Sequence, residues 1–145
     1  AIIEWLDATY AEPRLIPADA AARSAELAKA MVIAADIHPI NNLRILKYLK
    51  NELGQAQAEI DQWARHWIIE GFTALEAMAN PAKPFLSGDA PGLADVFLVP
   101  QMANARRVAT PLDAFPTLVA IDARATALEP FARAHPDAVK PARYD

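Results

Sequence analysis

One long apolar stripe, in residues 56–79, constrains the fold of this chain more than any other feature. Apolar residues recur there at steps of three and four, which is the period of one face of an α-helix. The members of the stripe are Ile60, Trp63, Ala64, Trp67, Ile68, Gly71, Phe72, Leu75 and Met78. No segment of the sequence alternates apolar and polar residues as a half-buried strand would, so other helices must cover this face. At Gly71 the lack of a side chain would let one of them approach closely.

Caps and breaks predict further helices before this stripe. Asp19 is a suitable N-cap for a helix that runs to about residue 37. Pro39 lacks an amide donor and disfavours helical geometry at His38, so we expect a break there, with the helix resuming to about residue 51. A glycine at position 54 then ends that segment.

Helices are also predicted after the stripe. Residues 93–108 are apolar nearly all round, which is typical of a helix in the middle of a bundle. Pro116 opens a further amphipathic helix, whose apolar face is formed by Leu118, Ile121, Ala125 and Leu128. A last helical turn carries Phe131, and we expect an extended tail over residues 135–145. The fold class is therefore all-α, a bundle of five or six helices.

The chain divides into three parts by this pattern. Residues 1–10 open in the middle of a helical pattern without a cap, as the tail of a helix would. Residues 11–18 contain two prolines and no helical period, and we interpret them as a linker. Residues 19–145 form one all-helical domain, a length that suits a single core.

Composition excludes several classes of function. Hydrophobic residues make up 54% of the 145 residues, and the formal net charge is -4. An acidic domain has no electrostatic reason to bind nucleic acid or an anionic membrane surface. Since the chain has no cysteine, it offers neither a disulfide nor a protein thiol nucleophile. No metal site is predicted, and the composition fits a reducing, cytoplasmic compartment.

The segment 87–95 has the features of a helix start. Gly92 stands at the N-cap position and Asp95 at the third helical position, from which its carboxylate can accept the N-cap amide hydrogen. The same carboxylate also favours the positive end of the helix dipole. We therefore interpret Asp95 as a structural residue and not as a catalytic one.

Two polar clusters are candidates for ligand binding. The first comprises His38, Asn42 and Arg44, around a proline break that would aim side chains into a cleft. A helix-terminal histidine bonded to a carbonyl, and an arginine on a solvated face, are the plainer alternatives. The second is the pair Arg106 and Arg107, near the end of a helix. These cations either complement the helix dipole or bind a carboxylate through two parallel hydrogen bonds.

The order and spacing of these motifs resemble the zeta class of glutathione transferases. The resemblance rests on Ala-Ile-Ile-Glu-Trp-Leu at residues 1–6, on the run from Asp36 to Arg44, and on residues 92–105. It implies the C-terminal helical domain of that fold, preceded by a thioredoxin-like domain whose last helix ends in residues 1–10. The family usually carries a hydroxyl residue where this chain has Gly92, which removes one half of its capping box.

The resemblance also implies a function. The family isomerises maleylacetoacetate or maleylpyruvate from cis to trans in aromatic amino acid catabolism, with glutathione supplying the sulfur nucleophile. Residue by residue, it assigns glutathione contacts to His38, Asn42, Leu43 and Arg44, and a carboxylate of the dicarboxylic substrate to Arg107. It assigns no catalytic residue to this segment, so we expect the isolated chain to be inactive. The resemblance also implies that the full-length protein forms a homodimer. A non-catalytic assembly module and a general detoxifying transferase are the alternatives.

Overall fold

The computed structural model describes residues 1–10 and 12–139, and within them the chain is helical without any strand. An isolated bridge between Phe85 and Gly88 is the one extended pairing in that part. The elements are α1 (Ile2–Thr9), α2 (Ala20–Met31), the π-helix η1 (Val32–Ile37), α3 (His38–Ile40), α4 (Leu43–Asn51), α5 (Gln57–Met78), α6 (Leu93–Arg107), α7 (Pro116–Thr126) and α8 (Glu129–Ala134). The predicted all-helical bundle is confirmed.

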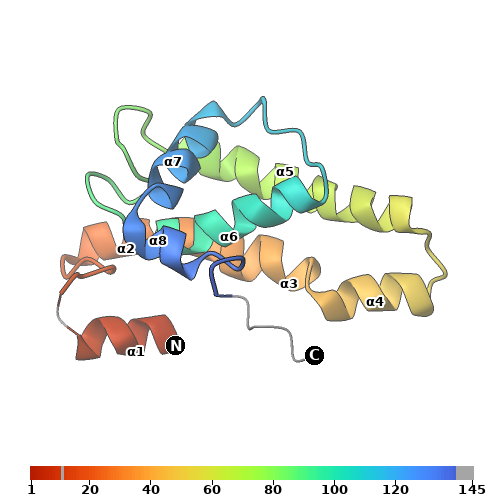
Figure 1. Ribbon diagram of the computed structural model, residues 1–145, viewed down its shortest axis with the longest axis horizontal. Helices are drawn as coiled ribbons and strands as arrows, with labels where there is room; N and C mark the ends of the chain where they lie inside the picture. The colour runs from red at the N-terminus through yellow and green to blue at the C-terminus, as the bar shows by residue number, and fades with distance from the viewer. Residues whose placement is uncertain (11, 140–145) are drawn as a thin grey trace.

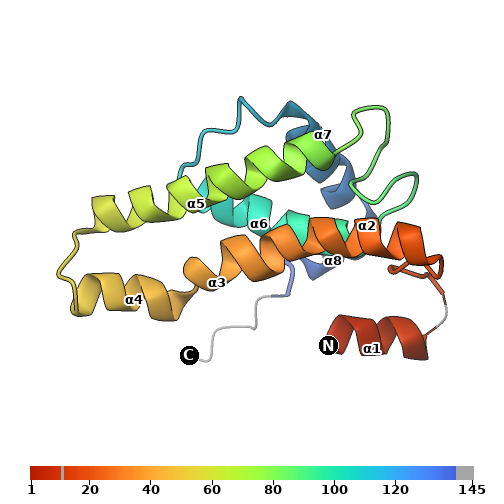
Figure 2. The same ribbon diagram turned by 180° about the vertical axis from the view of Figure 1, so that it is seen from behind.

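Helix α6 occupies the centre of the bundle. It packs against α2 and η1 on one side and against α7 on the other, while α5 contacts both η1 and α7. The rod formed by α2, η1 and α3 leads into α4, and α4 and α5 project together as a hairpin from the end of the bundle (Figures 1 and 2). Helix α1 lies outside the bundle, alongside α2. The helix that is apolar nearly all round in sequence is thus the central one.

The stripe on α5 supplies one wall of the core. Its most buried members are Ile60, Ala64, Ile68, Gly71, Phe72 and Leu75. Each large apolar side chain buried in this way contributes roughly 1.5–3 kcal/mol to folding. Gly71 faces Ile37 of η1 so closely that an added Cβ would collide with the Ile37 side chain. The predicted close approach at Gly71 is therefore confirmed, whereas Trp63 and Trp67 are half-buried and Met78 is 38% exposed.

The expected break at His38 is wrong in its position. His38 keeps helical angles, with φ -62° and ψ -44°, and Asn41 and Asn42 leave the helix instead. The reason lies in η1, where the N–H of His38 bonds to the carbonyl of Ile33, five residues earlier. The wider π turn accommodates Pro39, which has no N–H of its own to donate, and the rod continues to Ile40.

Other predicted boundaries are close to the observed ones. The side chain of Asp19 caps α2 by accepting the N–H of Ala22, and Gly54 has a φ of 66° beyond the end of α4. The expected extended tail is wrong over residues 135–139, which form a turn with hydrogen bonds onto the carbonyl of His135. Its remaining residues, 140–145, lie outside the described part of the chain. Leu128, expected on the face of α7, follows that helix and is half-buried.

The start of α6 is capped from a distant helix. Glu26 of α2 is 3% exposed, and its Oε1 accepts the N–H of Ala94 at 2.6 Å and the hydroxyl of Ser87, also at 2.6 Å. Ala94 is the second residue of α6, whose N–H is normally bonded by an N-cap hydroxyl. A Cβ on Gly92 would lie only 2.8 Å from that Glu26 oxygen. The carboxylate of Glu26 therefore occupies the space and the role of the absent capping hydroxyl.

This arrangement predicts that Gly92→Ser and Glu26→Ala are coupled. Alone, Gly92→Ser should destabilise by about 1–3 kcal/mol because the added atoms collide with Glu26 and Ser87. Alone, Glu26→Ala should cost about 1–3 kcal/mol because the buried N–H of Ala94 loses its acceptor. In the double variant the added hydroxyl can accept the freed N–H of Ala94, so the combined loss should be smaller than the sum. Urea denaturation of the four proteins measures this, and strict additivity would contradict it.

Candidate functional site

The first candidate cluster lies where α3 ends and α4 begins. Asn42 is the N-cap of α4, and its side-chain oxygen accepts the N–H of Arg44 at 3.1 Å. Leu43 is 64% exposed, and His38 and Arg44 are exposed as well. Their side chains have no polar partner in the described part of the chain. The carbonyl-bonded histidine considered from the sequence is thus not observed, and the turn presents an imidazole and a guanidinium to its surroundings.

The second candidate, Arg107, ends α6. It is exposed, and its Nη2 donates to the side-chain oxygen of Asn104 at 2.7 Å. Its neighbour Arg106 behaves differently and forms an ion pair of 2.6 Å with Asp122 of α7, a carboxylate that is 3% exposed. Of the two arginines, Arg106 joins α6 to α7, while Arg107 has no acidic partner among the residues described.

One turn of α5 forms hydrogen bonds both with the turn that carries His38 and Arg44 and with the end of α6 next to Arg107. The indole N–H of Trp63 donates to the carbonyl of Ile40 at 3.0 Å, beside the first cluster. Two residues further along, Arg65 donates to the carbonyl of Val108 at 2.9 Å, directly after Arg107. Asn41 adds a longer bond, of 3.4 Å, to the carbonyl of Ala64 between them. The structure therefore attaches the His38–Arg44 turn and the end of α6 to the same three residues of α5.

The exposed side chains at each of the two places suit the binding of anions. Arg44, Arg107 and His38 are exposed nitrogen donors, and guanidinium groups bind carboxylates with two parallel hydrogen bonds. Within residues 1–10 and 12–139, no group of three histidines, cysteines, aspartates or glutamates is placed to hold a metal ion. None of the helices in that same part has the length and apolar character needed to span a membrane.

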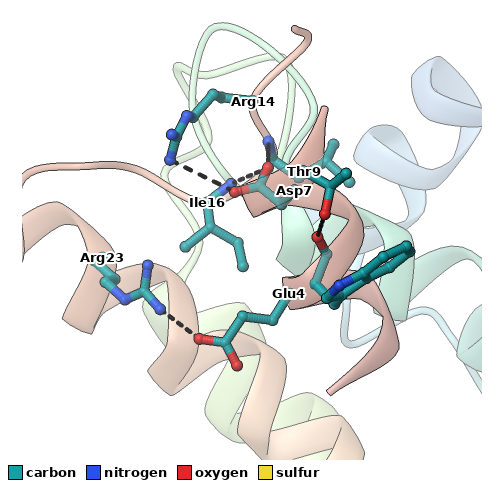
Figure 3. A network of polar contacts seen from close by, with 8 residues as sticks. Glu4, Asp7, Thr9, Arg14, Ile16 and Arg23 are labelled. Atoms are coloured by element: carbon teal, nitrogen blue, oxygen red, sulfur yellow. Dashed lines mark hydrogen bonds and ion pairs between the residues drawn. The ribbon is translucent and has the colours of Figure 1, made fainter. Parts of the chain in front are cut away.

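A separate polar network joins α1 to residues 14–16 and to α2 (Figure 3). Asp7 of α1 is buried, and its Oδ1 accepts the N–H of Leu15 at 2.6 Å and that of Ile16 at 3.3 Å. The carbonyl of Leu15 in turn accepts the N–H of Leu93, the first residue of α6, at 2.9 Å. Glu4 adds an ion pair with Arg23 of α2. The network positions residues 14–16 beside a cavity of about 230 Å³ next to Glu26 and Gly92.

Sequence reasoning missed two polar residues that matter here. Asn104 lies three residues before Arg107, a spacing that places both on one face of a helix and could have indicated their contact. Glu26 lies 68 residues before the N–H that it caps, and no local pattern could have indicated that pairing. Trp63 and Arg65 were visible in the sequence, but their carbonyl partners depend on the packing of α5.

Comparison with known proteins gives consistent matches over nearly the whole chain. A probable maleylacetoacetate isomerase of Vibrio cholerae is 51% identical over 138 residues, which are 94% of this chain and 64% of that protein. A maleylpyruvate isomerase of a Ralstonia species is 46% identical over 141 residues, 95% of this chain and 66% of that protein. The chain thus spans just under two thirds of the length of these relatives. No family model matches.

Solved structures agree with these relatives. A maleylpyruvate isomerase described as a bacterial glutathione S-transferase of the zeta class matches with a TM-score of 0.94 at 43% identity, covering 98% of this chain and 68% of that one. A maleylacetoacetate isomerase of Anaeromyxobacter dehalogenans, with dicarboxyethyl glutathione and citrate in its active site, matches with a TM-score of 0.90 at 38% identity. That match covers 99% of this chain and 64% of the other.

Proposed function

The chain belongs to the zeta class of glutathione transferases, and on that premise we propose that the protein isomerises maleylacetoacetate or maleylpyruvate from cis to trans with glutathione. The observation that carries the proposal is an exposed arginine, Arg107, at the end of the central helix without an acidic partner in the described residues. A dicarboxylic substrate needs such a cation. An assembly module does not, and this favours the enzyme over the non-catalytic alternative.

The turn between α3 and α4 fits glutathione by its chemistry. Glutathione has two carboxylates, and Arg44 and His38 are exposed donors suited to them. Asn42 retains its amide N–H groups for a ligand, because only its side-chain oxygen is used in capping α4. Leu43 offers an exposed apolar contact between these polar groups. When bound, glutathione would supply a thiolate that adds to the cis double bond and turns it into a single bond that can rotate; elimination then returns the thiolate and leaves the trans isomer.

Arg107 is proposed to hold a substrate carboxylate. Two relatives of known structure contain polycarboxylates together with glutathione or a glutathione conjugate, one with citrate and one with malonate. Those ligands have the chemistry that a free guanidinium recognises. Fixing a carboxylate at the end of α6 would orient the double bond relative to a glutathione bound at the α3–α4 turn.

Helix α1 is proposed to be the end of a thioredoxin-like domain that completes the site. The exposed apolar residues of this helix and its end are Ile2, Trp5, Leu6 and Tyr10, and Trp5 is 62% exposed. Exposed apolar residues clustered in this way are typical of a surface that another part of a protein covers. A homodimer and a cytoplasmic location belong to the same proposal.

An assay of the full-length protein tests the function directly. We expect conversion of a maleyl substrate to its fumaryl isomer, followed by ultraviolet absorbance, that depends on added glutathione. A glutathione-dependent reaction with an uncharged aryl halide, faster than the isomerisation, would favour the detoxifying alternative. A protein that binds neither glutathione nor dicarboxylates and has no turnover would be a non-catalytic module.

His38 gives a second, finer prediction. If its imidazole donates a hydrogen bond to glutathione, His38→Gln should keep most of the activity, because an amide can donate from a similar place. His38→Ala should lose more, since the partner is left unpaired. The pH–rate profile separates this from proton transfer, in which Gln would be as damaging as Ala and one limb of the profile would vanish. Exposure of His38 on a helical backbone leaves the donor role open to it.

A further inference from the structure

We infer that Asn104 is the positioning residue of Arg107: its amide oxygen holds the guanidinium in place while leaving its charge free for a substrate carboxylate. The inference rests on the proposed function and adds to it a residue that acts through Arg107. Its basis is the 2.7 Å hydrogen bond from Nη2 of Arg107 to Oδ1 of Asn104, one helical turn earlier on α6.

The contrast between the two adjacent arginines shows why the partner is an amide. Arg106 pairs with the buried carboxylate of Asp122, and this partner cancels most of its charge. The Asn104 amide carries no net charge, so this partner does not neutralise the positive charge of Arg107, which stays available to attract a ligand carboxylate. A guanidinium has five N–H groups, and the bond to Asn104 engages one of its terminal nitrogens. The other side of the fork can still make two parallel bonds to a carboxylate.

A guanidinium that is already fixed before the ligand binds improves affinity, because an unconstrained arginine side chain would lose conformational entropy on binding. A long side chain that is immobilised on binding loses rotamer entropy, and this loss weakens the complex. Asn104 lies on a fixed part of the helix, since its own carbonyl accepts the N–H of Val108, whose carbonyl accepts Arg65 of α5. Arg107 is therefore held by a rigid neighbour before any ligand arrives.

The contact of Asn104 with Arg107 explains the residue better than packing does. Asn104 is half-buried, and among the described residues its side chain has no other polar contact. Removing it should leave the core of α6 intact, because the buried face of that helix is formed by other residues, including Leu98, Met102 and Ala105. A role limited to stability would change the unfolding midpoint and leave ligand affinity unchanged.

The test uses the full-length protein and maleate as a dicarboxylate probe, with binding measured by calorimetry. Asn104→Ala should weaken maleate about 3- to 10-fold, the range of one lost hydrogen bond. Asn104→Asp keeps an acceptor at the same place but adds a negative charge, and it should weaken maleate more than Asn104→Ala does. Glutathione affinity and the urea midpoint should stay within error in both. The Nε–Hε resonance of Arg107 in nitrogen-15 spectra should shift or broaden in Asn104→Ala.

Each outcome decides the inference. Unchanged maleate affinity in both variants would overturn it, and so would a parallel fall in glutathione affinity, which indicates general damage. Asn104→Asp binding maleate better than Asn104→Ala would refute the charge argument. The proposed function is judged separately, by glutathione-dependent turnover of the wild type. A wild type that binds maleate but does not isomerise would refute that function while leaving the role of Asn104 decided by the variants.

Discussion

Asp95→Ala is expected to remove a large part of the protein's free energy of unfolding at 25 °C. Asp95 is fully buried, and its carboxylate accepts three backbone N–H groups, from Leu86 at 2.7 Å, Ser87 at 3.1 Å and Gly92 at 3.0 Å. Alanine leaves these donors without their acceptor, and each buried unsatisfied donor costs about 1–3 kcal/mol. The sum of roughly 3–9 kcal/mol is comparable to the whole stability of a typical domain, about 5–15 kcal/mol.

Urea denaturation followed by circular dichroism measures this loss. The matched control is Asp89→Ala in the same loop, where the carboxylate is 79% exposed and pairs only with Lys83. Exposed pairs of this kind contribute about 0–1 kcal/mol, so the control should unfold close to the wild type. Asp95→Asn, which keeps one acceptor oxygen, should lie between the two. Equal midpoints for Asp95→Ala and Asp89→Ala would mean that the hydrogen bonds of Asp95 do not hold the loop to α6.

Arg107→Ala is expected to have the largest effect on activity. A charged hydrogen bond is worth roughly 1.5–3 kcal/mol, so the Michaelis constant for a dicarboxylic substrate should rise about 10- to 150-fold. An uncharged electrophile makes no use of the guanidinium, and its Michaelis constant should change little. Steady-state kinetics with both substrates on the full-length protein measure the difference.

Arg106→Ala is the control for this second experiment. Arg106 has the same chemistry and stands next in the chain, but it is paired with Asp122, so its loss should lower stability and leave the preference between the two substrates unchanged. If Arg107→Ala impairs both substrates equally, Arg107 is a helix-terminal residue and not a carboxylate anchor. Conversely, a selective effect in Arg106→Ala would mean that the two arginines had been assigned the wrong roles.

The sequence by itself determined the helices and which of them is central. The stripe on α5 and the apolar surface of α6 follow from spacing alone, because a helix that is apolar on a given face has to bury that face. Local chemistry also placed the cap at Asp19 and the close approach at Gly71, since each depends on a single residue type. The site residues, by contrast, were assigned from the resemblance to the zeta class, and only as positions along the chain.

Tertiary structure alone decided how those positions are used. Pro39 predicted a break, but whether a helix breaks at a proline or widens into a π turn depends on what packs against it, and here Gly71 admits Ile37 of η1. Arg106 and Arg107 are chemically identical in the sequence, but only Arg106 forms an ion pair with the buried Asp122 of α7, while Arg107 is hydrogen-bonded to the neutral Asn104. These outcomes depend on contacts between residues far apart in the chain, which local patterns do not encode, whereas helix formation and face burial depend on neighbours within a few turns.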